Sequence, residues 1–382
     1  MKKILAFLFF VSFLFTQNAT GADTMDAPQK IRMYIGTYTQ GSSEGIYQTT
    51  FDPETGSLSL AKLAAKMHNP SFLVKHPKLP VLYAVGRPAD GAVNAGETNT
   101  IAFNIDAKTG DLTPFSRGSS LGKGPCHLTV DPAGQVLLVA NYSSGSTAIF
   151  PLDKEGKLGK ATVYQHEGNG PNKGRQEGPH AHGVYLSADA RFALVPDLGI
   201  DKVMVYDLDA DNAKLLTPNK PFAETAPGAG PRHLAFAKDG KFVYVINELD
   251  STVGVYTYRA EDAEMRLQQT ISTLPKEYKG PNKTAEIFLH PNGKFLYASN
   301  RGHKSIAVYA VDTTSGKLTL VEYAPIGGVW PRYFTLDPSG KFLLVCNRHT
   351  DDIVVLRVNA KSGKLTPAGR SISVGQPVCL VW

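Results

Sequence analysis

The chain has 382 residues, 42% of them hydrophobic, so it is long enough to bury a large core. Its formal net charge is +6, and its Lys and Arg residues are scattered, which favours small anionic partners and gives no indication of nucleic-acid binding. The three cysteines are an odd number, so we expect no disulfide framework and leave a single Cys346–Cys379 bond open.

The first segment has the features of a secretory signal. Lys2 and Lys3 precede an almost wholly apolar run at residues 4–15, and a polar stretch then leads to Ala22. This pattern predicts a signal peptide over residues 1–22, cut near Ala22, because the apolar run is shorter than the roughly 20 residues that span a bilayer. We therefore expect a periplasmic or secreted monomer that binds no membrane, with an uncleaved anchor as the alternative.

A repeat of about fifty residues follows. In residues 127–141 an apolar strand, a turn containing Pro and Gly, and a second strand come in succession, and similar segments begin at residues 72, 183, 233, 287 and 333. Each copy continues with a third strand, as at 305–310, and usually a fourth after a Gly-Lys-Leu turn, as at 316–320. Four antiparallel strands at this period are typical of a β-propeller blade.

Fragments of a further repeat lie at the two ends of the chain. Residues 377–382 resemble a first strand without a second, while residues 33–38 and 45–51 resemble second and third strands without a first. Joined together they complete a seventh blade and hide the edge strands. We predict an all-β fold with a single domain over residues 23–382, a seven-bladed β-propeller whose ring is closed by the C-terminal strand joining the N-terminal strands in one blade.

The propeller topology predicts where a site would lie. The first strand of each blade lines the channel and the second runs antiparallel to it, so starts of first strands and ends of second strands meet at one mouth. The polar residues at these positions are His127, His180, His182, Arg232, His233, Glu286 and Arg332 at the starts, and Arg87, Glu248, Arg301 and His303 at the ends.

Several of these residues also have structural interpretations. The Asn that ends most second strands is expected to be a turn residue in left-handed backbone. Arg232, Glu248 and Arg301 could form an ion-pair belt without catalytic function. His180 and His182 stand two apart on an extended segment and should face the same side, but no third ligand follows at a suitable spacing, so we expect neither a metal nor a cofactor.

A set of motifs in the order of the chain is similar to a known family. The motifs are Tyr34-Ile-Gly-Thr-Tyr, Asn69-Pro-Ser-Phe-Leu, Gly124-Pro-Cys-His, Gly178-Pro-His-Ala-His, Gly230-Pro-Arg-His, Asn247-Glu-Leu and Ser299-Asn-Arg-Gly-His. Together they resemble the seven-bladed β-propeller lactonases, which include 6-phosphogluconolactonases and are related to the fungal carboxy-cis,cis-muconate cyclase. Gly86-Arg87 stands where family members often carry Asn-Glu, so the identity of the substrate is left open. The predicted signal peptide is a second reason to leave it open, because the pathway of 6-phosphogluconolactonases is cytoplasmic.

The resemblance implies hydrolysis of a sugar lactone by a catalytic set of His182 (or His180), Arg232, Glu248 and Arg301. We expect direct attack by water, with Glu248 as the base and His182 as the alternative base or the acid for the leaving alkoxide. The two Arg would hold an anionic group and the oxyanion. The expected substrate-binding residues are His180, His127, His233, Arg332, Arg87 and His303.

Two other functions fit the same residues. One is a lyase or cycloisomerase that moves a proton on a muconate-type carboxylate. The other is a non-catalytic binding propeller in the periplasm, because a fold alone does not determine function.

Overall fold

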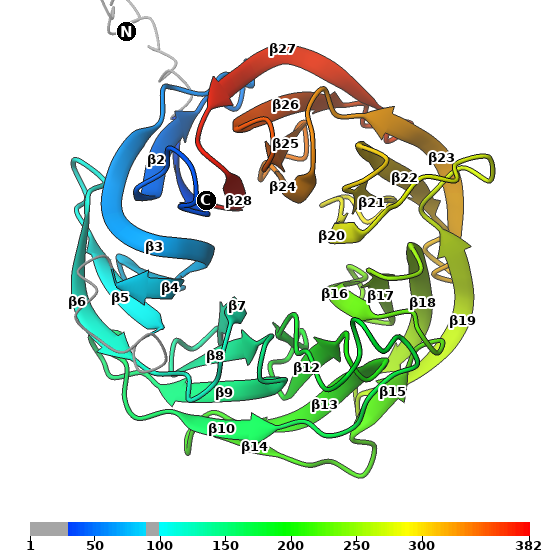
Figure 1. Cartoon of the computed structure of the whole chain (residues 1–382), viewed down its shortest axis with the longest axis horizontal. Coiled ribbons are helices and arrows are strands. Elements are labelled where there is room, and N and C mark those ends of the chain that lie inside the picture. Colours follow the sequence, from blue (N-terminus) through cyan, green and yellow to red (C-terminus); the bar gives the residue numbers. More distant parts are fainter. Residues whose placement is uncertain (1–29, 89–98) are drawn as a thin grey trace, which may run out of the picture.

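Strands arranged in a ring make up the described part of the protein. The computed structural model describes residues 30–88 and 99–382, without the side chains of 87, 88 and 370, so the predicted signal peptide lies outside it. Over these residues there are strands and no helices, grouped into seven blades around a central channel (Figure 1). The predicted all-β, seven-bladed propeller is confirmed. In the described ranges no helix could cross a membrane.

The strands of each blade run from the channel outwards. The blade that joins the termini holds β28 (Pro377–Val381), β1 (Ile31–Thr37), β2 (Gly45–Phe51) and the first part of β3 (Lys62–Lys75); the next holds the rest of β3, β4 (Val81–Pro88), β5 (Thr100–Ile105) and β6 (Leu112–Gly118). The third holds β7 (Pro125–Val130), β8 (Val136–Asn141), β9 (Ser146–Pro151) and β10 (Thr162–Gln165). The fourth holds β11 (Tyr185–Leu186), β12 (Phe192–Asp197), β13 (Lys202–Asp209), β14 (Lys214–Leu216) and β15 (Phe222–Glu224).

The last three blades follow the four-stranded pattern. They hold β16 (Pro231–Phe236), β17 (Phe242–Asn247), β18 (Thr252–Arg259) and β19 (Glu264–Ser272); then β20 (Thr284–Leu289), β21 (Phe295–Asn300), β22 (Ser305–Val311) and β23 (Leu318–Pro325); and finally β24 (Pro331–Leu336), β25 (Phe342–Asn347), β26 (Asp352–Val358) and β27 (Leu365–Ser373).

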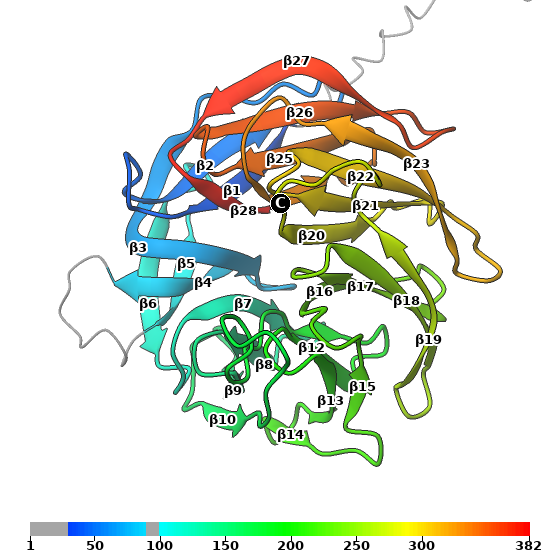
Figure 2. The same cartoon turned by 45° about the vertical axis from the view of Figure 1, so that its right-hand side comes forward.

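The ring closes as predicted from the two terminal fragments. β28 is the innermost strand of its blade and pairs antiparallel with β1, so that Ile35 lies opposite Leu380 (Figure 2). β3 is longer than the other strands because its first part pairs with β2 and its last part with β4, so one strand belongs to two blades. The backbone changes direction between them at Asn69, whose φ of 48° is in the left-handed region.

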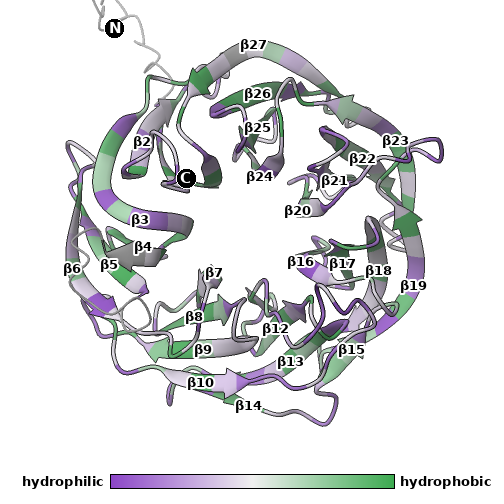
Figure 3. Ribbon diagram, viewed as in Figure 1, coloured by the Kyte–Doolittle hydropathy of each residue, from purple (hydrophilic) through white to green (hydrophobic). Residues whose placement is uncertain are grey.

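Packing between blades explains why the second strands are continuously hydrophobic. β8, β17, β21 and β25 are buried at every residue, because neighbouring blades cover both faces. Hydrophobic residues accordingly lie along the strands and hydrophilic ones in many connecting loops (Figure 3). Buried tyrosines bridge one blade to the next: the hydroxyl groups of Tyr34, Tyr83 and Tyr297 each donate to a glycine carbonyl, at 2.7–2.9 Å.

The turn after the second strand repeats from blade to blade. In three of the blades the Asn that ends the strand is buried and donates to the hydroxyl that starts the third strand, as between Asn247 and Thr252 at 2.9 Å. The left-handed residue comes four positions after that Asn, as at Ser251 with φ 59° and Lys304 with φ 57°. The expectation of left-handed backbone at the Asn itself was therefore wrong: the Asn amide closes the turn from an extended position.

Candidate active site

A cavity of about 780 Å³ opens at one mouth of the channel. Its walls come from the starts of first strands and the ends of second strands, which is the convergence expected from the topology. Among the described residues its charged lining is mostly cationic: Lys123, Arg175, Lys283, Arg301 and Arg332 face it together with one carboxylate, Glu248. Such an excess of positive charge favours an anionic ligand.

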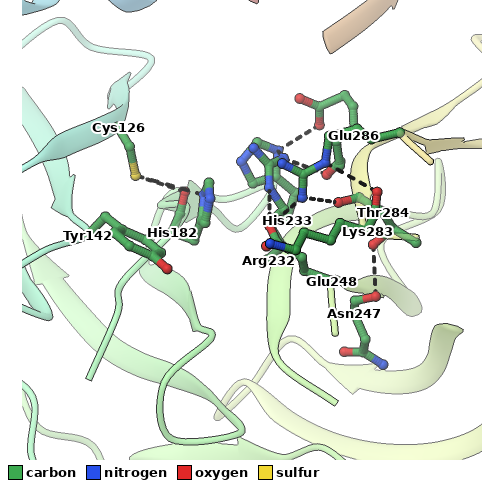
Figure 4. Close-up of polar contacts among 12 residues, drawn as sticks. Cys126, Tyr142, His182, Arg232, His233, Asn247, Glu248, Lys283, Thr284 and Glu286 are labelled. Carbon is green, nitrogen blue, oxygen red and sulfur yellow. Dashed lines mark hydrogen bonds and ion pairs between the residues drawn. The ribbon is translucent and has the colours of Figure 1, made fainter. Parts of the chain in front are cut away.

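Three guanidinium groups surround Glu248, which follows β17. Its Oε1 lies 2.7 Å from Arg175 Nη2, and its Oε2 lies 2.7 Å from Arg301 Nη2. Its Oε2 also lies 3.2 Å from Arg232 Nε, and Figure 4 shows Glu248 beside Arg232. The contact with Arg232 is an ion pair without hydrogen-bond alignment. The structure thus brings Arg232, Glu248 and Arg301 together, as predicted, within one buried cluster.

The charges of the cluster determine what Glu248 can do. Burial alone would raise the pKa of Glu248, but Arg301, Arg232 and Arg175 outweigh it and hold that pKa well below its usual value. Burial lowers the pKa of Arg301 to about 10, which still leaves its guanidinium charged at neutral pH. Glu248 is therefore a weak base, and it compensates only part of the positive charge around it.

Arg332 presents a cationic group to the cavity outside the cluster around Glu248. It is the second residue of β24 and lies against the ring of Tyr38, with 5.3 Å between its guanidinium carbon and the ring centroid. Arg348 lies against the same ring at 4.6 Å. In the part of the chain that the structure describes, no carboxylate pairs with Arg332, so its guanidinium can accept an anion from the cavity.

His182 and His180 both pack against Tyr142, with ring centroids 5.2 Å and 4.6 Å from it. His182 lines the cavity, whereas His180 stacks on Tyr142 and lies 3.3 Å from Glu177 (Nε2 to Oε1). The two residues flank Ala181, which bridges to Asp197 of β12, and their common contact with Tyr142 agrees with the expected shared side, although only His182 is part of the cavity wall. Burial, followed by the charge of Arg232, lowers the pKa of His182 well below its ordinary value, so its imidazole is neutral.

Cys126 lies beside His182, a contact that sequence reasoning missed. Its Sγ is 3.8 Å from His182 Nδ1 and donates to the carbonyl of the same residue at 3.4 Å (Figure 4). The two residues belong to neighbouring blades, so spacing along the chain gives no sign of the contact. Burial raises the pKa of the Cys126 thiol to about 12, which keeps it protonated and makes it a poor nucleophile. All three cysteines are free.

Two Gly-x-Ser-x-Gly stretches, at residues 41–45 and 118–122, do not provide a serine nucleophile. Ser43 is hydrogen-bonded to Thr37, and Ser120 donates to Asn141 at 2.6 Å. Both serines are buried, and no His is bonded to either within the described ranges. Direct attack by water therefore stays the better hypothesis.

The remaining predicted residues are not part of the cavity wall that the structure describes. His127 and His233 lie below the cavity, packed around Phe72. His303 bonds to Ser305 and packs on Tyr278, outside the cavity lining, so we leave it out of the site. Arg87 is in β4, but its side chain is outside the described part.

Arg175 was missed altogether by the sequence reasoning. It stands in the loop between β10 and β11, which has no counterpart in the other repeats; that irregular length was the available signal. Among the described residues no three His, Cys, Asp or Glu are placed to hold a metal ion.

Comparison with known proteins identifies the family. Residues 32–382 match the family model described as lactonase, seven-bladed β-propeller. The chain belongs to the seven-bladed β-propeller lactonase family. This confirms the resemblance and the lactonase class that the motifs predicted, while the substrate and the roles of single residues stay predictions.

Individual relatives cover nearly the same length. A 6-phosphogluconolactonase of Bacillus subtilis is 37% identical over 348 residues, which are 91% of this chain and 97% of that one. A 6-phosphogluconolactonase of Formosa agariphila is 32% identical, over 80% and 86% of the two chains. The solved structure of a periplasmic gluconolactonase of Pseudomonas aeruginosa aligns with a TM-score of 0.87 and 33% identity, over 92% and 99%.

Proposed function

We propose that this protein hydrolyses a small anionic sugar lactone, and that the reaction takes place in the cationic cavity at the channel mouth. The observation that carries the proposal is the buried cluster of three arginines around one carboxylate, which leaves positive charge uncompensated beside the cavity. The volume of about 780 Å³ suits a ligand of sugar size. The names of the relatives from Bacillus subtilis and Pseudomonas aeruginosa support a gluconolactone-type substrate.

Each charged residue then has a stated task. Arg332 and the cavity lysines hold the anionic group, and Arg301 stabilises the oxyanion that forms when water attacks the lactone carbonyl. Glu248 holds the guanidinium groups in position and does not act as the base, because three guanidinium groups occupy both of its carboxylate oxygens. On the cavity wall, neutral His182 is the residue that can take part in proton transfer.

A second part of the proposal concerns the compartment in which the enzyme acts. We infer a periplasmic or secreted enzyme from residues 1–22, and the periplasmic relative from Pseudomonas aeruginosa supports this. The cationic cavity would bind a carboxylate or a phosphate borne by the sugar.

The test is a substrate panel with the purified mature chain. Gluconolactone, 6-phosphogluconolactone and a muconate-type carboxylate are assayed side by side, with the rate of spontaneous hydrolysis subtracted. We expect lactone hydrolysis, with the larger kcat/KM for the anionic lactone. Turnover of the muconate-type compound alone would make the protein a cycloisomerase, and no turnover of any would favour a binding propeller.

A further inference from the structure

Below the cavity, a histidine and a glutamate from neighbouring blades form a buried pair. His233 lies on β16 and Glu286 on β20, and His233 Nδ1 is 2.8 Å from Glu286 Oε1. Both side chains are almost completely buried, at 2% and 4% exposure. The backbone amide of Ile287 also donates to Oε1, at 3.1 Å, which fixes the orientation of the carboxylate.

The pair leaves two polar atoms without a partner. Neither His233 Nε2 nor Glu286 Oε2 has a hydrogen bond to the described residues, although both atoms are buried. Leaving such buried atoms unsatisfied is energetically costly, so native proteins usually supply a water molecule or a ligand. With the His233 hydrogen on Nδ1 and Glu286 as a carboxylate, both atoms are acceptors, so they need a small molecule with two hydrogen-bond donors, as water has.

A small pocket lies beside these two residues. It has a volume of about 10 Å³, and His233, Glu286, Arg232 and Arg332 are among its walls. That is about the space of a single water molecule. Ser71, Cys126 and Arg332 line both this inner pocket and the large cavity, so the two spaces adjoin.

The surroundings favour proton transfer at the pair. The rings of His127, Tyr185 and Phe72 pack around His233, with centroids 5.2–6.3 Å away, and exclude bulk water. Burial raises the pKa of Glu286 to about 7, against the lowering effect of Arg232. Burial also lowers the pKa of His233 well below its ordinary value, so its imidazole is neutral, and the contact of Nδ1 with the Glu286 carboxylate is what supports proton uptake at the ring.

We propose that the inner pocket holds the water that attacks the lactone, that His233 is the catalytic base for it, and that Glu286 positions His233. This inference rests on the proposed function and deepens it. The Glu286 carboxylate accepts the Nδ1 hydrogen of His233, which leaves a lone pair on Nε2 directed at the water. The arrangement of carboxylate, imidazole and attacking oxygen follows the logic by which an acid orients a catalytic histidine.

The step balances without another reactant. One O–H bond of the water breaks and its proton goes to His233 Nε2, while the water oxygen bonds to the lactone carbonyl carbon. The carbonyl electron pair moves onto its oxygen, beside Arg301. The bond between that carbon and the ring oxygen then breaks, the carbonyl re-forms, and the ring oxygen takes the proton back from His233. The product is the open hydroxy acid.

The first experiment compares the variants Glu286→Gln and His233→Gln in the lactone assay. General-base catalysis contributes about 10²- to 10⁴-fold, so we expect kcat to fall by at least about a hundredfold with KM changed by less than about threefold. A solvent deuterium isotope effect on kcat should be present in the wild-type enzyme and weaker in both variants. If the two residues had only a structural role, the variants would lose stability, and kcat would not fall selectively while KM stayed nearly unchanged.

The control is His290→Gln. His290 is also buried, follows the far end of the strand that carries Glu286, and bonds to the Gly340 carbonyl at 3.0 Å. We expect it to keep its kcat. If Glu286→Gln and His233→Gln also keep theirs while His182→Asn loses activity, the base is His182 and the inference is overturned, although the proposed function stands.

A crystal structure of the wild-type protein tests the inference without any variant. One ordered water should lie within hydrogen-bonding distance of both His233 Nε2 and Glu286 Oε2, and an empty inner pocket would overturn the inference even if the variants do not fold. A different result would contradict the proposed function itself: the wild-type protein would then hydrolyse no lactone, and the assignment of His233 as base would fail for that reason.

Discussion

Two ion clusters of similar size differ in where they lie and in how their charges balance. Around Glu248, three arginines meet one carboxylate, and the side chains of Arg232, Arg301 and Glu248 are 2–6% exposed. On the outer surface, Lys220, Arg259 and Arg266 meet two carboxylates, Asp262 and Glu264, and the cations are 38–68% exposed. The surface cluster has one cation in excess and is exposed to water, whereas the buried one has two cations in excess, as a site for an anion would.

The clusters also differ in how many parts of the ring build them. The buried cluster takes residues from the loop after β10 and from the fifth and sixth blades, while four of the five surface residues come from the fifth blade alone. The geometry of the buried cluster therefore depends on how several parts of the closed ring are placed, whereas that of the surface cluster depends on local turns.

Opening the ring should give the largest effect. Truncation after Gln376 removes β28 and exposes the inner edge of β1, so we expect loss of cooperative unfolding or of solubility. Thermal unfolding followed by circular dichroism measures this. A truncated protein that melts like the full-length chain would contradict the assigned closure.

Next in size is the substitution Glu248→Gln, which leaves three guanidinium groups together without a carboxylate. Breaking a buried ion pair on one side costs about 3–5 kcal/mol of the free energy of unfolding, and lactonase activity should be lost with the geometry. Since the pKa of Glu248 is lowered by folding, its contribution to stability exists above the ordinary Glu pKa and is lost as the pH falls towards the folded value. Denaturant titrations at several pH values should show that the free energies of unfolding of the wild-type protein and of the Glu248→Gln variant become more similar as the pH falls.

The substitution Arg332→Ala should have a smaller, substrate-dependent effect. Charge-assisted hydrogen bonds contribute about 1.5–3 kcal/mol, so kcat/KM for an anionic lactone should fall roughly ten- to a hundredfold. Arg332→Lys should recover only part, because an ammonium group lacks the planar two-pronged contact. Lys241→Ala, on the exposed surface, is the control. Equal losses on charged and neutral lactones would instead assign Arg332 to the oxyanion.

The smallest effect is expected from Glu264→Gln in the surface cluster. Glu264 contacts three cations at 2.7–3.0 Å, much as Glu248 does. Water and salt screen the pairs on the surface, so the melting temperature and the activity should change little. A loss of stability as large as that of Glu248→Gln would show that burial does not distinguish the two clusters.

The fold was predictable because each blade repeats one hydrophobic pattern, and the fragments at residues 33–51 and 377–382 complete one another. The convergence of Arg232, Glu248 and Arg301 followed from topology alone. The contacts between blades did not follow: Arg175 reaches Glu248 from an irregular loop, and Cys126 meets His182 across two repeats. Sequence periodicity describes a single blade, and such contacts depend on how blades pack against each other.

The pairing of Ile35 with Leu380 has a consequence for the nascent chain. β1 and β2 leave the ribosome early, but β28, the inner partner of β1, is translated only after all the other blades, on the order of tens of seconds later. During this interval the first blade has an open inner edge that can pair with other strands. Folding to the closed ring is thus tied to the end of synthesis, and chaperones that shield strand edges should bind this protein before its last strand emerges.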